Sequence, residues 1–229
     1  MHTLTTTGLA SLALLTASAG ALAQEQTFQL TGTVVGLVDE LGVFTDVGIG
    51  DEASGLLQYD PAREPLAPLD FLGRAEFEIQ TVEATIGGSI FSPVGPAFGA
   101  IAVGSGAFEG VSEELLGVLP AEIFGVGLDA ARFFASLEQT GGSNSASINA
   151  SFTGPENWLN AQRLPGEDIF TADIIDSGNI VVSFASIGLV EVDCTDGSDG
   201  PCFTFDIIES TAVIEVETVS SQGVTLWGS

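Results

Sequence analysis

The sequence predicts an all-β protein, an antiparallel β-sandwich of jelly-roll type with one or two short helices. Apolar and polar residues alternate with a period of two over several short segments, which is typical of half-buried strands. Gly, Pro and Asp residues separate these segments, as turns do. One wet face and one buried face indicate antiparallel pairing, and a regular series of short strands favours a sandwich or jelly roll.

The clearest alternation begins at Ala75. Apolar Ala75, Phe77 and Ile79 alternate with Glu and Gln, and Val82 opens a second alternation that runs to residue 86. The apolar positions change parity between the two series, near Thr81. A bulge or a bend at that point would explain the change.

Further strand signals lie on both sides of this region. Thr-, Val- and Phe-rich segments bounded by Gly or Asp predict strands at residues 27–38, 42–50, 55–60, 148–152 and 179–192. Near the C-terminus, Phe203, Phe205 and Ile207 alternate with polar residues, and residues 212–217 repeat the pattern, so we expect one buried face on each segment. The uncharged residues 84–108 predict two buried strands joined by a turn at residues 92–96.

Helix is the minority element. Residues 130–138 place four apolar side chains at helical spacing behind a candidate cap, Asp129, with Gly141 shortly after the end. The same residues are also compatible with a strand, and the pattern alone does not decide between the two. A second helix candidate opens at Ser112-Glu113-Glu114 and is stopped by Pro120.

Residues 1–23 predict a signal peptide. A run of apolar and small residues, 9–23, ends in Ala21-Leu22-Ala23, the small-x-small pattern of a signal-peptidase site. We expect cleavage before Gln24, which leaves a secreted or periplasmic protein with one β domain at residues 24–229. The run is too short for a membrane-spanning helix, which needs ~20 apolar residues. The alternative is a buried N-terminal helix.

The charge is strongly acidic. The chain has 31 acidic residues and a net charge of −27, and its four basic residues are Arg63, Arg74, Arg132 and Arg163. Such a field repels nucleic acid and anionic membranes, so we expect neither as a partner. Cations, basic proteins and a saline medium are compatible with it. The composition fits a saline setting or serves solubility alone.

The two cysteines, Cys194 and Cys202, predict one disulfide, because their number is even and the protein is expected to be exported. The bridge would close a loop at the tip of a hairpin and stabilise the fold by roughly 2–3 kcal/mol. A redox or metal-thiolate site is the alternative. Against this alternative, the predicted mature chain has no Cys-x-x-Cys motif and no histidine that could complete a zinc site.

The same loop predicts a calcium site at Asp193, Asp196 and Asp199. A glycine-rich acidic loop can converge side-chain and carbonyl oxygens on calcium, which takes about six to eight oxygen ligands. The three-residue spacing differs from that of an EF-hand, and ordinary turns are the alternative. No other cofactor is expected.

The catalytic inventory excludes most familiar mechanisms. The chain has no lysine, and its one histidine, His2, lies in the predicted signal peptide. Histidine-based dyads and triads, histidine zinc sites, Schiff bases and P-loops are therefore excluded from the mature chain. Glycoside hydrolysis needs only two carboxyl groups. The candidates are Asp51, Glu52, Asp60, Glu167 and Asp168, and the aromatic side chains that could line a sugar site are Tyr59, Trp158 and Trp227.

Two segments resemble a known group. Residues 31–61 and 160–184 are similar to the secreted β-sandwich domains of exported bacterial proteins that use the PEP-CTERM sorting system. The resemblance in the first segment rests on Gly32, Thr33, Val34, Val47, Gly48, Gly50, Asp51, Gly55, Tyr59 and Asp60. In the second it rests on Leu164, Pro165 and Phe170. It implies a β fold and export, and no catalytic residues. Since the sequence ends in VTLWGS without a Pro-Glu-Pro motif, we expect no sorting or anchoring by that system.

These observations favour a noncatalytic, secreted, acidic β domain with a structural or interaction role outside the cell, its partner being a polysaccharide or a protein. A carboxylate-based, carbohydrate-active enzyme of the glycoside hydrolase type is the alternative. A cleft that joins carboxylates to Trp158 or Tyr59 would favour the enzyme.

Overall fold

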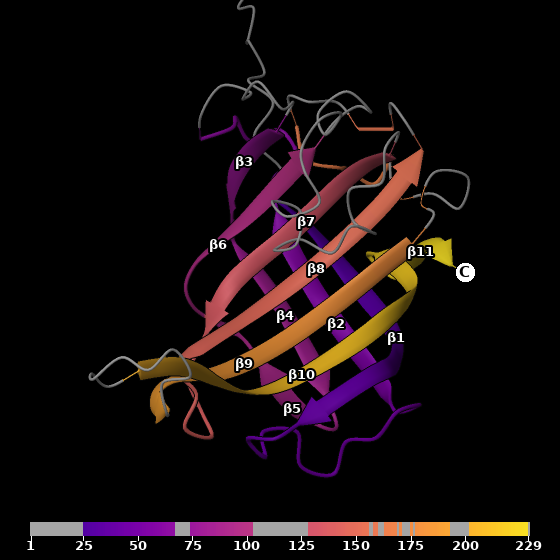
Figure 1. Cartoon of the computed structure of the whole chain (residues 1–229). Coiled ribbons are helices and arrows are strands. Elements are labelled where there is room, and N and C mark those ends of the chain that lie inside the picture. The colour runs from indigo at the N-terminus through magenta and orange to yellow at the C-terminus, as the bar shows by residue number, and fades with distance from the viewer. Residues whose placement is uncertain are drawn as a thin grey trace, which may run out of the picture.

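The computed structural model describes residues 25–66, 74–102, 128–155, 158–159, 163–168, 170, 175, 177–192 and 202–228 (Figure 1). These residues form eleven strands and no helix. The strands are β1 (Gln26–Asp39), β2 (Glu52–Tyr59), β3 (Arg74–Ile79), β4 (Thr81–Ile86), β5 (Ser89–Phe91), β6 (Pro93–Ala102), β7 (Leu128–Leu137), β8 (Ser145–Pro155), β9 (Ser177–Val192), β10 (Cys202–Ser221) and β11 (Val224–Gly228). The all-β expectation is confirmed. None of these residues belongs to a helix that could cross a membrane.

All strands pair antiparallel in one sheet, in the order β3-β6-β7-β8-β9-β10-β1-β2-β4-β5, with β11 on β10. The expected division into two sheets of a sandwich or jelly roll is not seen, because one hydrogen-bonded ladder joins the strands. The long hairpins β7–β8 and β9–β10 form its middle (Figure 1).

A bent hairpin connects the two ends of the sheet. Only Gln80 separates β3 from β4, and only Ser92 separates β5 from β6. Nevertheless β3 pairs with β6 beside β7, whereas β4 pairs with β5 beside β2. The parity change near Thr81 is therefore a sharp bend at which the chain passes from one half of the sheet to the other. The turn of this hairpin is Gly87-Gly88, not residues 92–96 as expected, since both glycines have positive φ.

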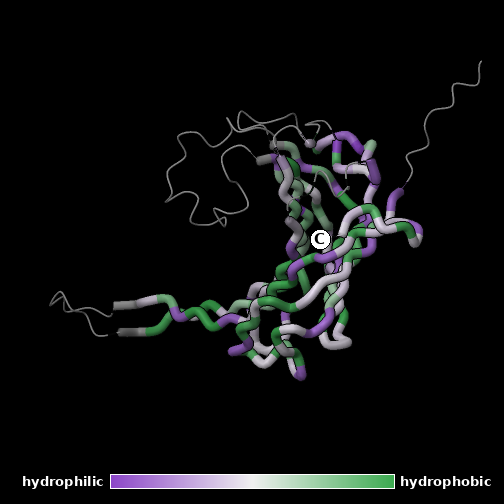
Figure 2. Tube along the Cα trace, turned by 90° about the vertical axis from the view of Figure 1, so that its right-hand side faces the viewer, coloured by the Kyte–Doolittle hydropathy of each residue, from purple (hydrophilic) through white to green (hydrophobic). Residues whose placement is uncertain are grey.

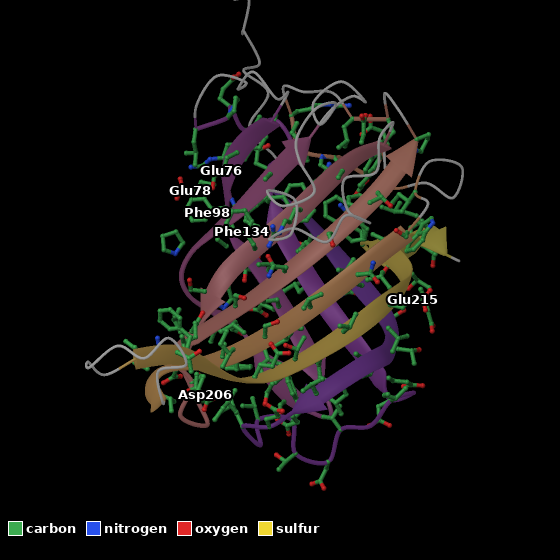
Figure 3. The ribbon with its side chains drawn as sticks, viewed as in Figure 1. Glu76, Glu78, Phe98, Phe134, Asp206 and Glu215 are labelled. Atoms are coloured by element: carbon green, nitrogen blue, oxygen red, sulfur yellow. The ribbon has the colours of Figure 1, made fainter. Side chains whose placement is uncertain are left out.

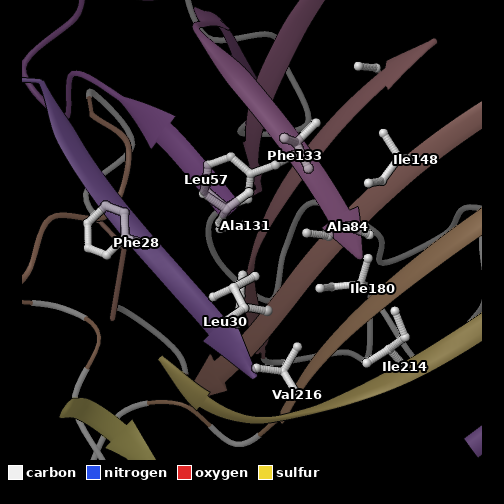
Figure 4. Close-up of a cluster of buried hydrophobic side chains, with 14 of the residues drawn as sticks. Phe28, Leu30, Leu57, Ala84, Ala131, Phe133, Ile148, Ile180, Ile214 and Val216 are labelled. Atoms are coloured by element: carbon white, nitrogen blue, oxygen red, sulfur yellow. The ribbon is translucent and has the colours of Figure 1, made fainter. Parts of the chain in front are cut away.

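The curled sheet buries its apolar face against itself. Strands β1, β2 and β4 lie across the core from β7, β8 and β9, and Figure 4 shows their side chains converging. Tyr59 of β2 stacks on Phe133 of β7 with ring centroids 4.9 Å apart. A Cβ at Gly55 would lie 2.6 Å from a methyl carbon of Ile180 on β9. The inward apolar residues of these strands thus meet in one core.

Gly32 marks the tightest point of the sheet. β1 and β10 change register between Thr31 and Gly32. A Cβ at Gly32 would lie 2.0 Å from the carbonyl oxygen of Glu215, a distance that no side chain tolerates. Glycine is required here by the close approach of two backbones.

The segment between β8 and β9 covers one end of the core. The buried Tyr59 hydroxyl donates to the Pro165 carbonyl oxygen at 2.8 Å. The backbone N–H of Leu159 donates to the buried carboxylate of Asp129 at 2.9 Å. Phe170 packs on Phe28 and on Phe152, with centroids 4.9 and 5.2 Å apart. These contacts fix the segment to β1, β2, β7 and β8.

The helix prediction at residues 130–138 is wrong, and its alternative, a strand, is observed as β7. The buried residues follow a period of two, through Ala131, Phe133 and Ala135. Gly141 and Gly142 have φ of 62° and 82°, which suits the tight turn of a β-hairpin. The second helix candidate, at Ser112, lies outside the described residues.

Residues 42–50, expected as a strand, form a loop between β1 and β2. Asp39 holds it: its carboxylate accepts from the N–H of Val43 at 2.7 Å, from that of Phe44 at 3.0 Å and from the Ser210 hydroxyl at 2.7 Å. Burial by itself raises the pKa of Asp39, but the hydrogen bonds from Ser210 and the backbone outweigh it and leave the pKa below its usual value. The ionised form therefore stabilises the loop.

Strands β9 and β10 extend well beyond their neighbours. β8 pairs with β9 only up to Ala185, and β1 pairs with β10 only from Ser210 onward. Residues 186–192 and 202–209 form the remainder, which we call the arm, and Figure 2 shows it projecting from the body. The expectation of a buried face on this segment is wrong: Phe205 is 69% exposed and Ile207 is 57% exposed.

Candidate functional site

The predicted loop site lies almost entirely outside the described residues. This applies to Cys194 and to Asp193, Asp196 and Asp199. Cys202 is the first residue of β10, and its backbone pairs with Val192. The disulfide and the calcium site therefore stay predictions. Within the described part of the chain, no three His, Cys, Asp or Glu residues are grouped so that they could hold a metal ion.

The five candidate catalytic carboxylates fall at opposite ends of β2. Asp51 and Glu52 lie where β2 begins, and Asp60 follows its last residue. At ~3.3 Å per strand residue, Glu52 and Asp60 are about 25 Å apart. Glu167 and Asp168 lie at the Asp60 end, because Tyr59 binds Pro165 and because a Cβ at Gly166 would lie 3.8 Å from the Cβ of Pro61. The two groups cannot combine as a glycosidase pair, which needs ~5–9.5 Å.

Four of these carboxylates make local contacts. Asp51 accepts from the N–H of Gly48 at 2.8 Å, and Asp60 accepts from the N–H of Ala62 at 2.9 Å. Glu167 accepts from the Ser221 hydroxyl at 2.5 Å. Asp168 pairs with Arg163 at 2.9 Å. These hydrogen bonds are typical of carboxylates that fix turns and chain ends.

The aromatic side chains expected for a sugar site are buried. Tyr59 is fully buried, and Trp158 and Trp227 are 9% and 4% exposed. Burial raises the pKa of the Tyr59 phenol well above its usual value, which suits a neutral hydroxyl that donates to Pro165. None of the three side chains offers an open platform on which a sugar ring could stack.

A polar groove of about 690 Å³ crosses the outer face of β1, β2 and β4. Apart from the methyl group of Ala53, its side chains carry hydroxyl or carboxylate oxygens, and none is basic or aromatic. The lining residues are Thr31, Gly32, Thr33, Gly50, Glu52, Ala53, Ser54, Thr85, Gly87, Gly88 and Glu217. A neighbouring hollow of about 360 Å³ shares Thr31, Ser54 and Thr85, and Gln29 and Glu83 extend the polar lining.

Hydrogen bonds across strands order this groove. The Thr33 hydroxyl donates to Glu217 at 2.5 Å, and the hydroxyls of Thr31 and Thr218 lie 2.6 Å apart. Donors and acceptors in this density can bind a hydroxyl-rich chain or the basic side chains of a protein. The groove lacks the apolar lining that is usual in a small-molecule pocket.

Arg132 of β7 lies at a second surface site, on the outer face of β7 and β8. Arg63 and Arg163 pair with carboxylates, whereas Arg132 donates to the Asn149 side-chain oxygen at 3.0 and 2.6 Å. Its guanidinium lies 5.6 Å from the ring centroid of Phe134. Burial lowers the pKa of Arg132. These contacts stabilise the outer face of β7 and β8.

A hollow of about 240 Å³ opens beside Arg132, with Phe98 and Phe134 on its wall. The two rings lie 5.7 Å apart, and Figure 3 shows them side by side on β6 and β7. The contrast with the groove is chemical: the groove offers oxygen atoms, whereas this hollow offers a cation and two aromatic rings.

Sequence reasoning missed both places. The groove residues are the outward row of strands that the sequence predicted, for example Thr31 and Thr33 between Leu30, Gly32 and Val34. That alternation was visible. The order of strands, which brings Glu217 of β10 beside β1 and β2, was not.

The chain matches no protein-family model, no curated protein and no solved structure.

Proposed function

We propose that this chain is a noncatalytic, acidic β domain that is exported and has a structural or interaction role outside the cell. The burial of Tyr59, Trp158 and Trp227 carries the proposal. A carbohydrate-active enzyme would be expected to present such rings beside two carboxylates in a cleft. The carboxylates nearest Tyr59 instead make local contacts, Asp60 with the N–H of Ala62 and Asp168 with Arg163.

The groove supports an interaction role. It is open and lined with oxygen atoms, and it lies on a chain with a net charge of −27. A hydroxyl-rich polysaccharide or a basic protein segment suits that surface, whereas nucleic acid is repelled. Glu52 and Glu217 provide the charges that such a partner would meet.

Export is supported by the sequence of residues 1–23 and by the resemblance to exported bacterial β domains. The test is to express the full chain in a bacterial host and to sequence the N-terminus of the mature protein. We expect a protein that begins at Gln24 and is found outside the cytoplasm. An uncleaved protein in the cytoplasm would contradict this part of the proposal.

The noncatalytic role is tested by incubating the mature chain with soluble polysaccharides and measuring new reducing ends. The matched variant is Glu52→Gln with Glu217→Gln, which removes both groove carboxylates. We expect no hydrolysis by either protein, and weaker retention of the variant on the polysaccharide or polycationic column that retains the wild type. Hydrolysis that the variant loses would establish the alternative, a carboxylate-based glycoside hydrolase.

We also propose the Cys194–Cys202 disulfide and calcium binding by Asp193, Asp196 and Asp199. The pairing of Cys202 with Val192 supports a hairpin tip at this loop. Peptide mass mapping without reduction tests the disulfide, and free thiols at both cysteines would contradict it. The melting temperature tests calcium: no increase at millimolar calcium, with magnesium as control, would contradict that site.

A further inference from the structure

The arm carries a cluster of exposed apolar side chains on one face. In the β9–β10 register, Ile187 lies opposite Ile207 and Leu189 lies opposite Phe205. Directly opposed residues share a face of the sheet, so all four point the same way. Their exposed fractions run from 46% for Ile187 to 69% for Phe205. A soluble protein that exposes such a group of neighbouring large apolar residues is typically offering an interaction surface.

The arm also has open backbone edges. At its base, Asn144 binds the N–H and carbonyl of Ile187 with its side chain, and Glu40 binds the N–H and carbonyl of Glu209. Because these groups alternate along an antiparallel strand, the backbone of Ile207, of Phe205 and of residue 203 points outward from the edge of β10. No described residue pairs with those groups.

The open edge decides what kind of surface can cover the arm. A lipid bilayer would bury the apolar face and leave the outward N–H and C=O groups without partners, at a cost of several kcal/mol each. A β-strand added at the edge of β10 would bury the apolar side chains of the arm and would also pair with its outward N–H and C=O groups. The chemistry of the arm therefore favours strand addition by a protein.

We propose that the arm pairs with the arm of a second copy of this chain, antiparallel, along the edge of β10. The outward backbone groups allow only registers that pair odd-numbered residues with odd-numbered ones. Among these we propose the register in which Phe205 lies opposite Phe205 of the second copy. Asp206 then faces Thr204 of the second copy, so that no carboxylate opposes another across the pair. Such a pairing is self-complementary, as a twofold dimer requires.

The projection of the arm makes this pairing compatible with two strongly acidic bodies. In the antiparallel arrangement each body lies at the far end of the paired arms. Four residues separate Phe205 from Glu209, so the two body edges are roughly 26 Å apart at ~3.3 Å per residue. The Debye length is about 8 Å at physiological ionic strength, so most of the repulsion is screened. The dimer is expected to strengthen with salt.

The test is sedimentation velocity of the mature chain over two decades of concentration, in about 0.15 M and about 1 M NaCl. We expect a monomer–dimer equilibrium that shifts toward dimer in the higher salt. The variant Phe205→Glu is expected to weaken dimerisation at least tenfold. Its control is Ile90→Glu, which adds the same charge at a residue on β5 that is 68% exposed.

Circular dichroism spectra and melting temperatures establish that both variants fold, since neither side chain is in the core. The proposal is overturned if the wild type stays monomeric at both NaCl concentrations. It is also overturned if Phe205→Glu dimerises as strongly as the wild type, or if Phe205→Glu and Ile90→Glu weaken dimerisation equally. A further measurement is flotation with neutral phosphatidylcholine vesicles. If the wild type binds these vesicles without dimerising, and Phe205→Glu abolishes that binding, the surface is assigned to lipid instead.

Discussion

Strands β9 and β10 each run through two environments, the body and the arm. In the body, Ile180 and Ile214 are buried, because β8 and β1 flank the two strands and the opposite half of the sheet covers them. In the arm, Leu189 and Phe205 are 67% and 69% exposed, although the strands pair in the same way. Strand pairing is thus common to both regions, and burial is decided by neighbouring strands.

The largest expected contrast is between two phenylalanines. Phe152 of the body is fully buried, and Phe152→Ala is expected to reduce the free energy of unfolding by about 3–5 kcal/mol, through lost burial and a cavity. Phe205→Ala in the arm removes an exposed ring and is expected to change it by less than about 0.5 kcal/mol. Urea unfolding of dilute, monomeric protein measures both. Equal losses would mean that the arm is packed on the body.

The second contrast is between two glycines. Gly32→Ala places a methyl group against the Glu215 carbonyl, and we expect a loss of about 3 kcal/mol or more, because two strands must separate. Gly188→Ala is the matched control in the arm, where no atom lies within 4 Å of the added Cβ. Thermal unfolding of the two variants is the measurement. A stable Gly32→Ala protein would contradict the close approach of β1 and β10.

The base of the arm is sensitive to acid through Asp39, which binds Ser210. Its folded pKa lies below the ordinary value near 3.8, so its carboxylate stabilises the protein above that pH and loses the effect as the pH falls through the folded pKa. Asp39→Asn is expected to cost about 1.5–3 kcal/mol at neutral pH. Urea unfolding at several pH values measures the difference in free energy of unfolding between the wild type and the variant. This difference should narrow as the pH falls below about 4. A difference independent of pH would contradict this role.

The smallest loss expected from a change in the body is that of Tyr59→Phe, which keeps the ring and removes one hydrogen bond to Pro165. A loss of about 0.5–1.5 kcal/mol is expected in urea unfolding. An unchanged free energy of unfolding would show that the segment between β8 and β9 is not fixed by this bond.

The sequence predicted the strands better than their arrangement. Thr-, Val- and Phe-rich composition bounded by Gly or Asp located β1, β2, β8 and β9. The parity change at Thr81 was seen, but only pairing shows that β3 and β4 belong to different halves of the sheet. The spacing of the apolar residues in β7 is compatible with both a helix and a strand. Gly141, which lies in the hairpin turn after β7, was interpreted as the end of a helix.

The candidate site was less predictable, for a related reason. Residues with hydroxyl groups, such as Thr31 and Thr33, line a groove only because strands distant in the sequence lie beside β1. Phe205 and Ile207 alternate in the same way as buried residues do. What distinguishes them is the absence of a flanking strand among the described residues, and a period of two carries no information about that.

Amide hydrogen exchange at two protein concentrations tests the account most directly. In dilute, monomeric protein we predict slow exchange at Ile180 and Ile214 in the body and fast exchange at Phe205 and Ile207, whose N–H groups point outward from the arm. At concentrations where the dimer forms, Phe205 and Ile207 should become protected while the body is unchanged. Protection of the arm in the monomer, or no protection at any concentration, would contradict the account.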